Sequence, residues 1–135
     1  MLLGIDHIGL ITGAPADLAP FLAALGMART DDGTADDYGV ACEFWQGQGE
    51  PAVELVSPSR PGSVLDTRLA SGGPGLHHIA FRVNGLRSEL DRLRGRGFTA
   101  VDAEPRAGAR PGMFVAFAYL RPAGLLVELV EYLGE

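Results

Sequence analysis

The possible functions of this 135-residue chain are narrowed by what it lacks or has little of. Its single cysteine, Cys42, excludes an internal disulfide and fits a reducing cytosol, so we expect a cytoplasmic protein. No apolar run approaches the roughly 20 residues of a membrane helix, and the N-terminus lacks the cationic region of a signal peptide. Lysine is absent, and 17 acidic against 11 basic residues give a net charge of −6. That charge argues against nucleic acid or a membrane as a partner.

The remaining composition is that of an ordinary globular protein. Hydrophobic residues make up 47% of the chain and charged residues 21%, which is typical of a soluble domain. The length predicts one domain, residues 1–135, with a core of its own. Cys42 lies in an apolar run and is interpreted as a core residue.

The most informative feature is a polar pair that occurs twice. His7 and His78 each lie in an apolar, strand-like run, and Glu54 and Glu128 each lie in the tetrapeptide Val-Glu-Leu-Val. The histidines are 71 residues apart and the glutamates 74. So small a difference across half the chain indicates a duplicated module with matching polar positions.

The spacing of apolar residues and turns predicts the pattern βαβββ in each half. Module 1 covers about residues 1–58, a linker about 59–74, and module 2 about 75–135. In module 1, Leu18, Phe21, Leu22 and Leu25 predict one apolar helical stripe, and the acidic stretch 30–37 is expected to be a loop. The fold class is therefore α+β, with two paired βαβββ modules that form a curled mixed sheet around a central metal cleft.

The four repeated polar residues are candidate ligands of one divalent cation: His7, Glu54, His78 and Glu128. Imidazole and carboxylate suit Co²⁺, Mn²⁺, Ni²⁺, Zn²⁺ or Fe²⁺, and the pattern does not choose among them. The alternative is that the histidines are hydrogen-bonded core residues and the glutamates exposed. However, an unpaired carboxylate inside a Val/Leu run is costly, and a cation removes that cost. Strand alternation turns His77 away from His78, so we assign His77 and its repeat partner Asp6 to packing or outer hydrogen bonds.

The chain resembles the vicinal oxygen chelate (glyoxalase/bleomycin resistance/dioxygenase) superfamily, and within it most resembles the methylmalonyl-CoA epimerases. The resemblance spans nearly the whole chain. Its most specific part is the string Gly-Leu-His-His-Ile-Ala-Phe. The matching segments are Ile5-Asp6-His7-Ile8-Gly9, Tyr38-Gly39-Val40, Val53-Glu54-Leu55, Gly75-Leu76-His77-His78-Ile79-Ala80-Phe81-Arg82-Val83, Glu104-Pro105-Arg106 and Leu126-Val127-Glu128-Leu129.

This resemblance implies a metal-dependent isomerase that moves a proton at the carbon alpha to a thioester through a metal-stabilised enolate. The implied substrate is an acyl-CoA, methylmalonyl-CoA above all, and the implied assembly is a homodimer. Epimerisation needs two bases on opposite faces of the substrate. The resemblance assigns one to Glu128 and the other to the acidic residue before the Gly-Val pair, here Asp37.

Glu43 is the rival for the second base, since an extended strand would place it on one face with Asp37 and Trp45. Tyr38 and Trp45 are aromatic residues that we expect to line the cleft and bind substrate. Arg106 and Arg110 are cations expected near its rim, with Arg106 the preferred ligand for a carboxylate or phosphate.

Four other functions within the superfamily stay open. A glyoxalase I-like lyase has the same ligand order, but residues 121–124 lack the aspartate of its usual Asp-Pro-x-Gly turn. A biosynthetic-pathway member could act on another oxygen-chelating substrate. An extradiol dioxygenase would leave Glu54 unused. A drug-binding resistance protein is the non-enzyme alternative, and such proteins generally lack the metal residues.

Overall fold

A computed structural model describes residues 1–49, 51–120 and 123–134. The turn compared above with that of glyoxalase I includes residues 121 and 122, which lie outside the described part. Across the described part, no helix is long and apolar enough to cross a membrane. The elements of the first half are β1 (Leu2–Ile11), α1 (Pro15–Ala24), β2 (Ala28–Ala35), β3 (Val40–Gln46) and β4 (Ala52–Pro58). Helix α2 (Asp66–Gly72) follows in the linker. The second half contains β5 (Gly75–Val83), α3 (Leu86–Gly95), β6 (Thr99–Ala100), β7 (Arg106–Ala107), β8 (Met113–Leu120) and β9 (Leu125–Tyr132).

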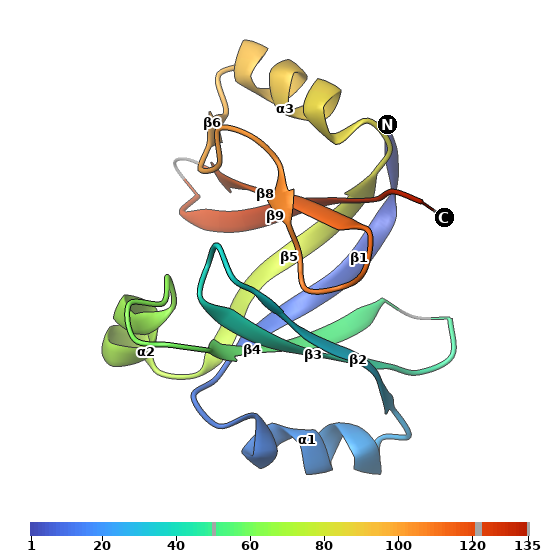
Figure 1. The fold of residues 1–135 in the computed structure, drawn as a ribbon, viewed down its shortest axis with the longest axis vertical. Coiled ribbons are helices and arrows are strands. Elements are labelled where there is room, and N and C mark those ends of the chain that lie inside the picture. The colour runs from blue at the N-terminus through green and yellow to red at the C-terminus, as the bar shows by residue number, and fades with distance from the viewer. Residues whose placement is uncertain (50, 121–122, 135) are drawn as a thin grey trace.

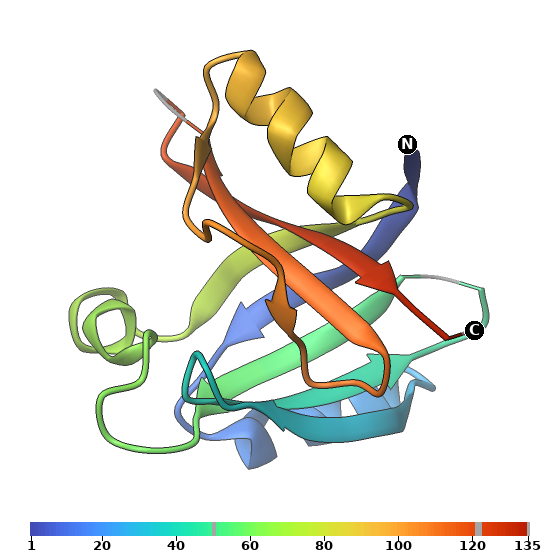
Figure 2. The ribbon, with the colours of Figure 1, turned by 45° about the horizontal axis from the view of Figure 1, so that its top comes forward.

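The nine described strands form one mixed sheet with a mirrored order. That order is β2-β3-β4-β1-β5-β9-β8-β6, and β7 pairs with β8. Within each half the first and last strands pair in parallel, β1 with β4 and β5 with β9. The long strands β1 and β5 join the halves, and the sheet curls between α1 and α3 (Figures 1 and 2). The α+β fold with a curled mixed sheet is confirmed.

The antiparallel pairing of β1 with β5 positions both histidines. His7 lies opposite Ala80, and Gly9 lies opposite His78. In the parallel pairs, Gly9 is also the Cα partner of Glu54, and Ala80 is that of Glu128. Each glutamate is therefore aligned with the residue two positions after its module's histidine, so the duplication seen in the sequence is also a duplication in space.

The two helices that flank the sheet differ in how they pack. In α3, Leu86 and Leu90 are buried in a cluster with Ala116 and Leu129. In α1, Leu22 is the buried residue, whereas Phe21 and Leu25 are 62% and 64% exposed. The predicted helix is present, but two of the four residues of its apolar stripe are exposed.

The stretch expected to be a loop, residues 30–37, was assigned wrongly for most of its length. Residues 30–35 belong to β2, an edge strand that, among the described strands, pairs with β3 alone. Most of its side chains are exposed, so no buried face imposes the apolar alternation by which a strand is recognised. Polar and acidic residues on an edge strand also discourage pairing with another chain.

Gly9 allows a test of the register between β1 and β5, in which it lies opposite His78. A Cβ at Gly9 would lie 2.3 Å from Cε1 of His78 and 2.6 Å from its Nδ1. We predict that Gly9→Ala displaces the His78 ring and lowers the free energy of unfolding by about 1–3 kcal/mol, the usual cost of overpacking. Gly13→Ala is the control, because a Cβ at Gly13 meets no atom within 4 Å. Equal stability of the two variants in urea unfolding would contradict the register.

Candidate metal centre

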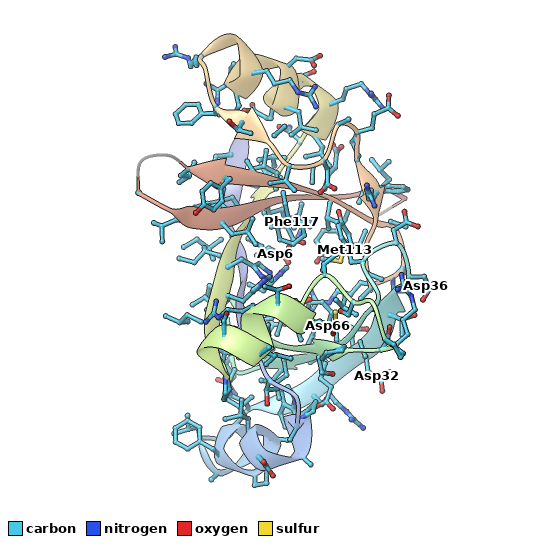
Figure 3. All side chains as sticks on the ribbon, turned by 90° about the vertical axis from the view of Figure 1, so that its left-hand side faces the viewer. Asp6, Asp32, Asp36, Asp66, Met113 and Phe117 are labelled. Carbon is cyan, nitrogen blue, oxygen red and sulfur yellow. The ribbon has the colours of Figure 1, made fainter. Side chains whose placement is uncertain are left out.

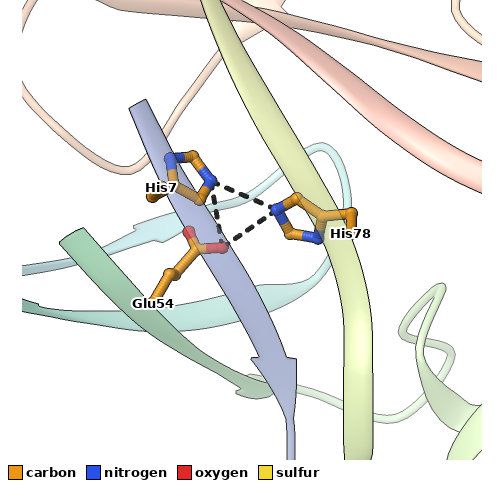
Figure 4. A group of neighbouring side chains, drawn as sticks. All are labelled: His7, Glu54 and His78. Carbon is orange, nitrogen blue, oxygen red and sulfur yellow. Dashed lines mark hydrogen bonds and ion pairs between the residues drawn. The ribbon is translucent and has the colours of Figure 1, made fainter. Parts of the chain in front are cut away.

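The two histidines and Glu54 converge on one point inside the curl of the sheet (Figure 4). The Nε2 atoms of His7 and His78 are 3.1 Å apart. Oε1 of Glu54 lies 3.4 Å from Nε2 of His7 and 3.3 Å from Nε2 of His78. These atoms come from β1, β4 and β5, the strands at the junction of the modules.

Glu128 of β9 joins the same cluster. Its Oε1 is 2.9 Å from Nε2 of His7 and 3.6 Å from Nε2 of His78. Glu54 and Glu128 are each only 5% exposed. Oε1 of Glu128 nevertheless has no partner in well-formed hydrogen-bond geometry among the described residues. The structure thus brings together all four residues that the sequence proposes as ligands.

The electrostatics of the cluster call for a positive charge. Burial of His7 disfavours its charged form, yet the nearby carboxylates of Asp6, Glu128 and Glu54 outweigh burial and raise the pKa of His7 to about 12. Burial also disfavours the charged form of Glu54, which by itself would raise its pKa. His7 and His78 outweigh burial and hold the pKa of Glu54 well below its usual range. In the metal-free chain a proton on His7 therefore supplies the charge that the buried carboxylates require.

The two histidines of the cluster have partners on their outer sides. Nδ1 of His7 lies 2.7 Å from Oδ2 of Asp6, and Nδ1 of His78 lies 2.8 Å from Nδ1 of His77. Burial, followed by His78 and Arg68, lowers the pKa of His77 to about 4. His77 is thus neutral and can accept a hydrogen from Nδ1 of His78, which leaves Nε2 of His78 for a cation. Burial and the nearby carboxylate of Glu54 raise the pKa of the Cys42 thiol.

These observations fit a divalent metal ion. Two imidazole nitrogens and two carboxylate oxygens face one another. Oε1 of Glu128 lacks a well-formed hydrogen bond among the described residues, and the buried negative charge is costly without a cation. The donor set is one that Zn²⁺, Fe²⁺, Co²⁺, Ni²⁺ and Mn²⁺ accept. His7, Glu54, His78 and Glu128 would hold the ion.

A mostly apolar pocket of about 300 Å³ opens beside the cluster. Glu54, His78 and Glu128 line it, whereas His7 lies behind them and is wholly buried. Both modules contribute apolar walls; Phe117 and Met113 of β8 lie between the two halves in Figure 3. The other residues that line the pocket include Val40, Cys42, Val56, Leu65, Val115 and Leu126.

One polar wall of the pocket contains a residue that the sequence did not reveal. Asp102 is 3% exposed and accepts hydrogen bonds from the Tyr38 hydroxyl at 2.8 Å and the Phe117 amide at 2.9 Å. Its Oδ1 pairs with Nε of Arg106 at 3.2 Å, and the guanidinium lies over the Tyr38 ring. Tyr38 and Arg106, both expected to bind substrate, therefore do line the pocket and are held there by Asp102.

Four other candidates lie elsewhere. Asp37 is exposed in the turn before β3, and Glu43 lies on β3 with Trp45, whose Nε1 donates to it at 3.1 Å. The alternate residues of β3, Val40 and Cys42, line the pocket, so Glu43 and Trp45 face away from it. Arg110 also lies outside the pocket and pairs with Asp31, its Nε 3.2 Å from Oδ2. The structure does not bring any of these four to the apolar pocket.

Comparison with known proteins agrees with this geometry. The model of the glyoxalase/bleomycin resistance protein/dioxygenase superfamily matches residues 6–117, and the chain belongs to this superfamily. The resemblance inferred from the sequence is thereby confirmed. An uncharacterized protein of Bacillus subtilis (strain 168), YqjC, is 35% identical over 133 residues, with 97% of this chain and 94% of that protein covered.

Solved structures of methylmalonyl-CoA epimerases are similar to this fold. The enzyme from Mycobacterium tuberculosis has a TM-score of 0.88 and 28% identity, covering 97% of this chain and 89% of the other. A variant of the Streptomyces coelicolor epimerase, in complex with 2-nitronate-propionyl-CoA, has a TM-score of 0.86 and 27% identity, covering 99% and 100%. A hypothetical protein from Bacillus halodurans C-125 has a TM-score of 0.87 and 29% identity, covering 97% and 95%.

The raised pKa of His7 predicts that metal and proton compete for this site. Because that pKa, about 12, lies above the ordinary 6.5, the proton stabilises the metal-free fold fully below pH 6.5, and this stability is lost as the pH rises towards 12. Near neutral pH, metal binding should release about one proton, and affinity should rise about tenfold per pH unit. Calorimetry of Co²⁺ binding in buffers with different ionisation enthalpies measures the release, and zero release would contradict the prediction.

Proposed function

We propose that this chain is a metal-dependent isomerase that moves a proton at the carbon alpha to a thioester and epimerises methylmalonyl-CoA. The observation that carries the proposal is the convergence of His7, Glu54, His78 and Glu128 at a small apolar pocket. Similarity to methylmalonyl-CoA epimerases at TM-scores of 0.86 to 0.88 supports the choice of reaction. The pocket lies at the lower end of the range for small-molecule sites, roughly 300–1,000 Å³, and suits the acyl head of the thioester.

The pocket residues supply the parts of a proton transfer. A divalent cation bound there would supply Lewis-acid polarisation of a carbonyl oxygen, which makes the neighbouring C–H more acidic. Glu128 removes the proton, and its surroundings suit this role better than those of the two histidines. Asp6 and His77 bond the outer nitrogens of the histidines, whereas Oε1 of Glu128 has no well-formed hydrogen bond among the described residues.

The second face of the substrate needs a second base. The positions of Asp37 and Glu43 outside the pocket do not favour either for this role. Glu54 is the counterpart of Glu128 in module 1, aligned with Gly9 as Glu128 is with Ala80. Because the modules are related by the mirrored strand order, Glu54 approaches the cluster from the other module. We therefore assign the second base to Glu54.

Deuterium exchange tests this reaction and both bases. Incubation with (2S)- or (2R)-methylmalonyl-CoA in D₂O should exchange the C2 hydrogen, and EDTA should abolish the exchange. Glu128→Gln and Glu54→Gln keep an oxygen ligand but cannot accept a proton. Each should lose exchange from one stereoisomer by about 10²–10⁴-fold, the usual contribution of a general base.

Two outcomes would contradict the proposal. Failure of the wild-type protein to exchange C2 hydrogen with any of Co²⁺, Mn²⁺ or Ni²⁺ would eliminate the epimerase activity. Equal loss of exchange from both stereoisomers in Glu54→Gln, with metal content retained, would remove Glu54 from the role of second base. Glu43→Gln is the matched control, since its carboxylate bonds Trp45 on the far face of β3, and its exchange rate should be unchanged.

Arg106 is proposed to bind the anionic part of the substrate. Its Nε pairs with Asp102, and a guanidinium has five N–H donors, so others remain for a carboxylate or phosphate. We predict that Arg106→Met raises KM about tenfold and leaves kcat within about twofold, as expected for loss of uniform binding. Arg29→Met is the control, since Arg29 pairs with Glu43. A fall in kcat with unchanged KM for Arg106→Met would contradict this role.

The homodimer stays a prediction. Leu2 and Leu3 are 60% and 54% exposed on β1 and offer an apolar surface for such a contact. Sedimentation analysis decides the point.

A further inference from the structure

A row of polar groups leads from the outer side of His7 away from the substrate pocket. Nδ1 of His7 lies 2.7 Å from Oδ2 of Asp6. The hydroxyl of Tyr132 donates to the same oxygen at 3.0 Å. Arg110 in turn donates from Nη1 to the Tyr132 hydroxyl at 3.0 Å. The three residues come from β1, β9 and the segment between β7 and β8, so the row joins parts of the chain far apart in sequence.

This row faces a different cavity from the substrate pocket. Asp6, Tyr132 and Arg110 line a polar cavity of about 410 Å³ and none of them lines the apolar pocket. Asp6 lies in the middle of the molecule (Figure 3), with its side chain 7% exposed. The row therefore acts on His7 from behind, without access to a substrate beside Glu128.

The hydrogen bonds of this row converge on the carboxylate of Asp6, which accepts from both sides. Arg110 donates to Tyr132, Tyr132 donates to Asp6, and His7 donates to Asp6 through Nδ1. A hydrogen fixed on Nδ1 leaves the Nε2 lone pair as the metal donor. Arg110 also packs 3.9 Å from the centre of the Phe44 ring, which meets the His7 ring edge-on at 5.5 Å. The orientation of His7 is thus fixed by hydrogen bonds on one side and by packing on another.

Among the described residues of the second module, the position behind the histidine is occupied differently. The outer partner of His78 is the imidazole of His77, where His7 has the carboxylate of Asp6. A carboxylate bonded to the outer nitrogen makes an imidazole a stronger electron-pair donor to a metal than an uncharged partner does. The two imidazoles of this duplicated site are therefore chemically unequal.

We infer that Asp6, Tyr132 and Arg110 are positioning residues that fix the tautomer and orientation of His7 and thereby set the affinity of the site for its metal. The inference rests on the metal site of the proposed function. It assigns no contact with substrate to any of the three residues. It extends the metal site by a row of groups that reaches a separate cavity.

Co²⁺ affinity of two tyrosine variants tests the inference. Tyr132→Phe removes one hydroxyl from the row. Tyr38→Phe is its matched control, because the Tyr38 hydroxyl also donates to a buried carboxylate, Asp102, but that carboxylate does not contact His7. By calorimetry, Tyr132→Phe should raise the Kd for Co²⁺ about tenfold and Asp6→Asn about 10–100-fold. Tyr38→Phe should stay within about twofold of wild type.

The Co²⁺ absorption spectrum provides a second readout that a merely structural role would not change. Its visible bands should shift in Tyr132→Phe and remain in place in Tyr38→Phe. Tyr132→Phe carries the test alone if Asp6→Asn fails to fold. Equal Kd values and spectra for the two tyrosine variants, with wild type binding Co²⁺, would overturn this inference and leave the proposed function standing. Absence of Co²⁺ binding by wild type would overturn both.

Discussion

The burial of Glu54 and Glu128 is the constraint on which the rest of the structure depends. Each carboxylate lies in an apolar strand and is 5% exposed, a placement that costs several kcal/mol for an ion without compensation. His7 provides the compensation as an imidazolium in the metal-free chain. A metal ion would provide it better, because it would also satisfy the unpartnered oxygen of Glu128. The fold brings the four groups together by joining two modules at β1 and β5.

Duplication of the module explains why the four ligands are arranged symmetrically, and later divergence explains why their neighbours differ. The same strand positions recur in each module, so His7 matches His78 and Glu54 matches Glu128. What lies behind each ligand has diverged. The two histidines, bonded on their outer nitrogens, are suited to fixing a metal, and the two carboxylates, one from each module, are suited to moving a proton. The site can therefore combine metal binding and proton transfer within one set of four residues.

The sequence predicted the metal residues because both the apolar surroundings of these residues and their repetition can be read along the chain without knowledge of the fold. A histidine and a glutamate inside apolar strands are conspicuous, and their repetition at nearly equal spacing marks equivalent positions. The second base could not be found in this way. Counting alternation from Asp37 to Glu43 crosses the turn at residues 36–39, where the count loses its meaning, since β3 begins at Val40. Asp102 was missed because its partners, Tyr38 and the Phe117 amide, lie in distant segments. Edge strand β2 was missed because it has no buried face.

The most direct test of the central claim is a crystal structure of the protein with Co²⁺, measured by anomalous diffraction at the cobalt edge. The account predicts one anomalous peak about 2.0–2.2 Å from Nε2 of His7, Nε2 of His78 and a carboxylate oxygen each of Glu54 and Glu128, the bond lengths usual for such ligands. An anomalous peak elsewhere, or none at this position with His7 and Glu128 still in direct contact, would contradict it.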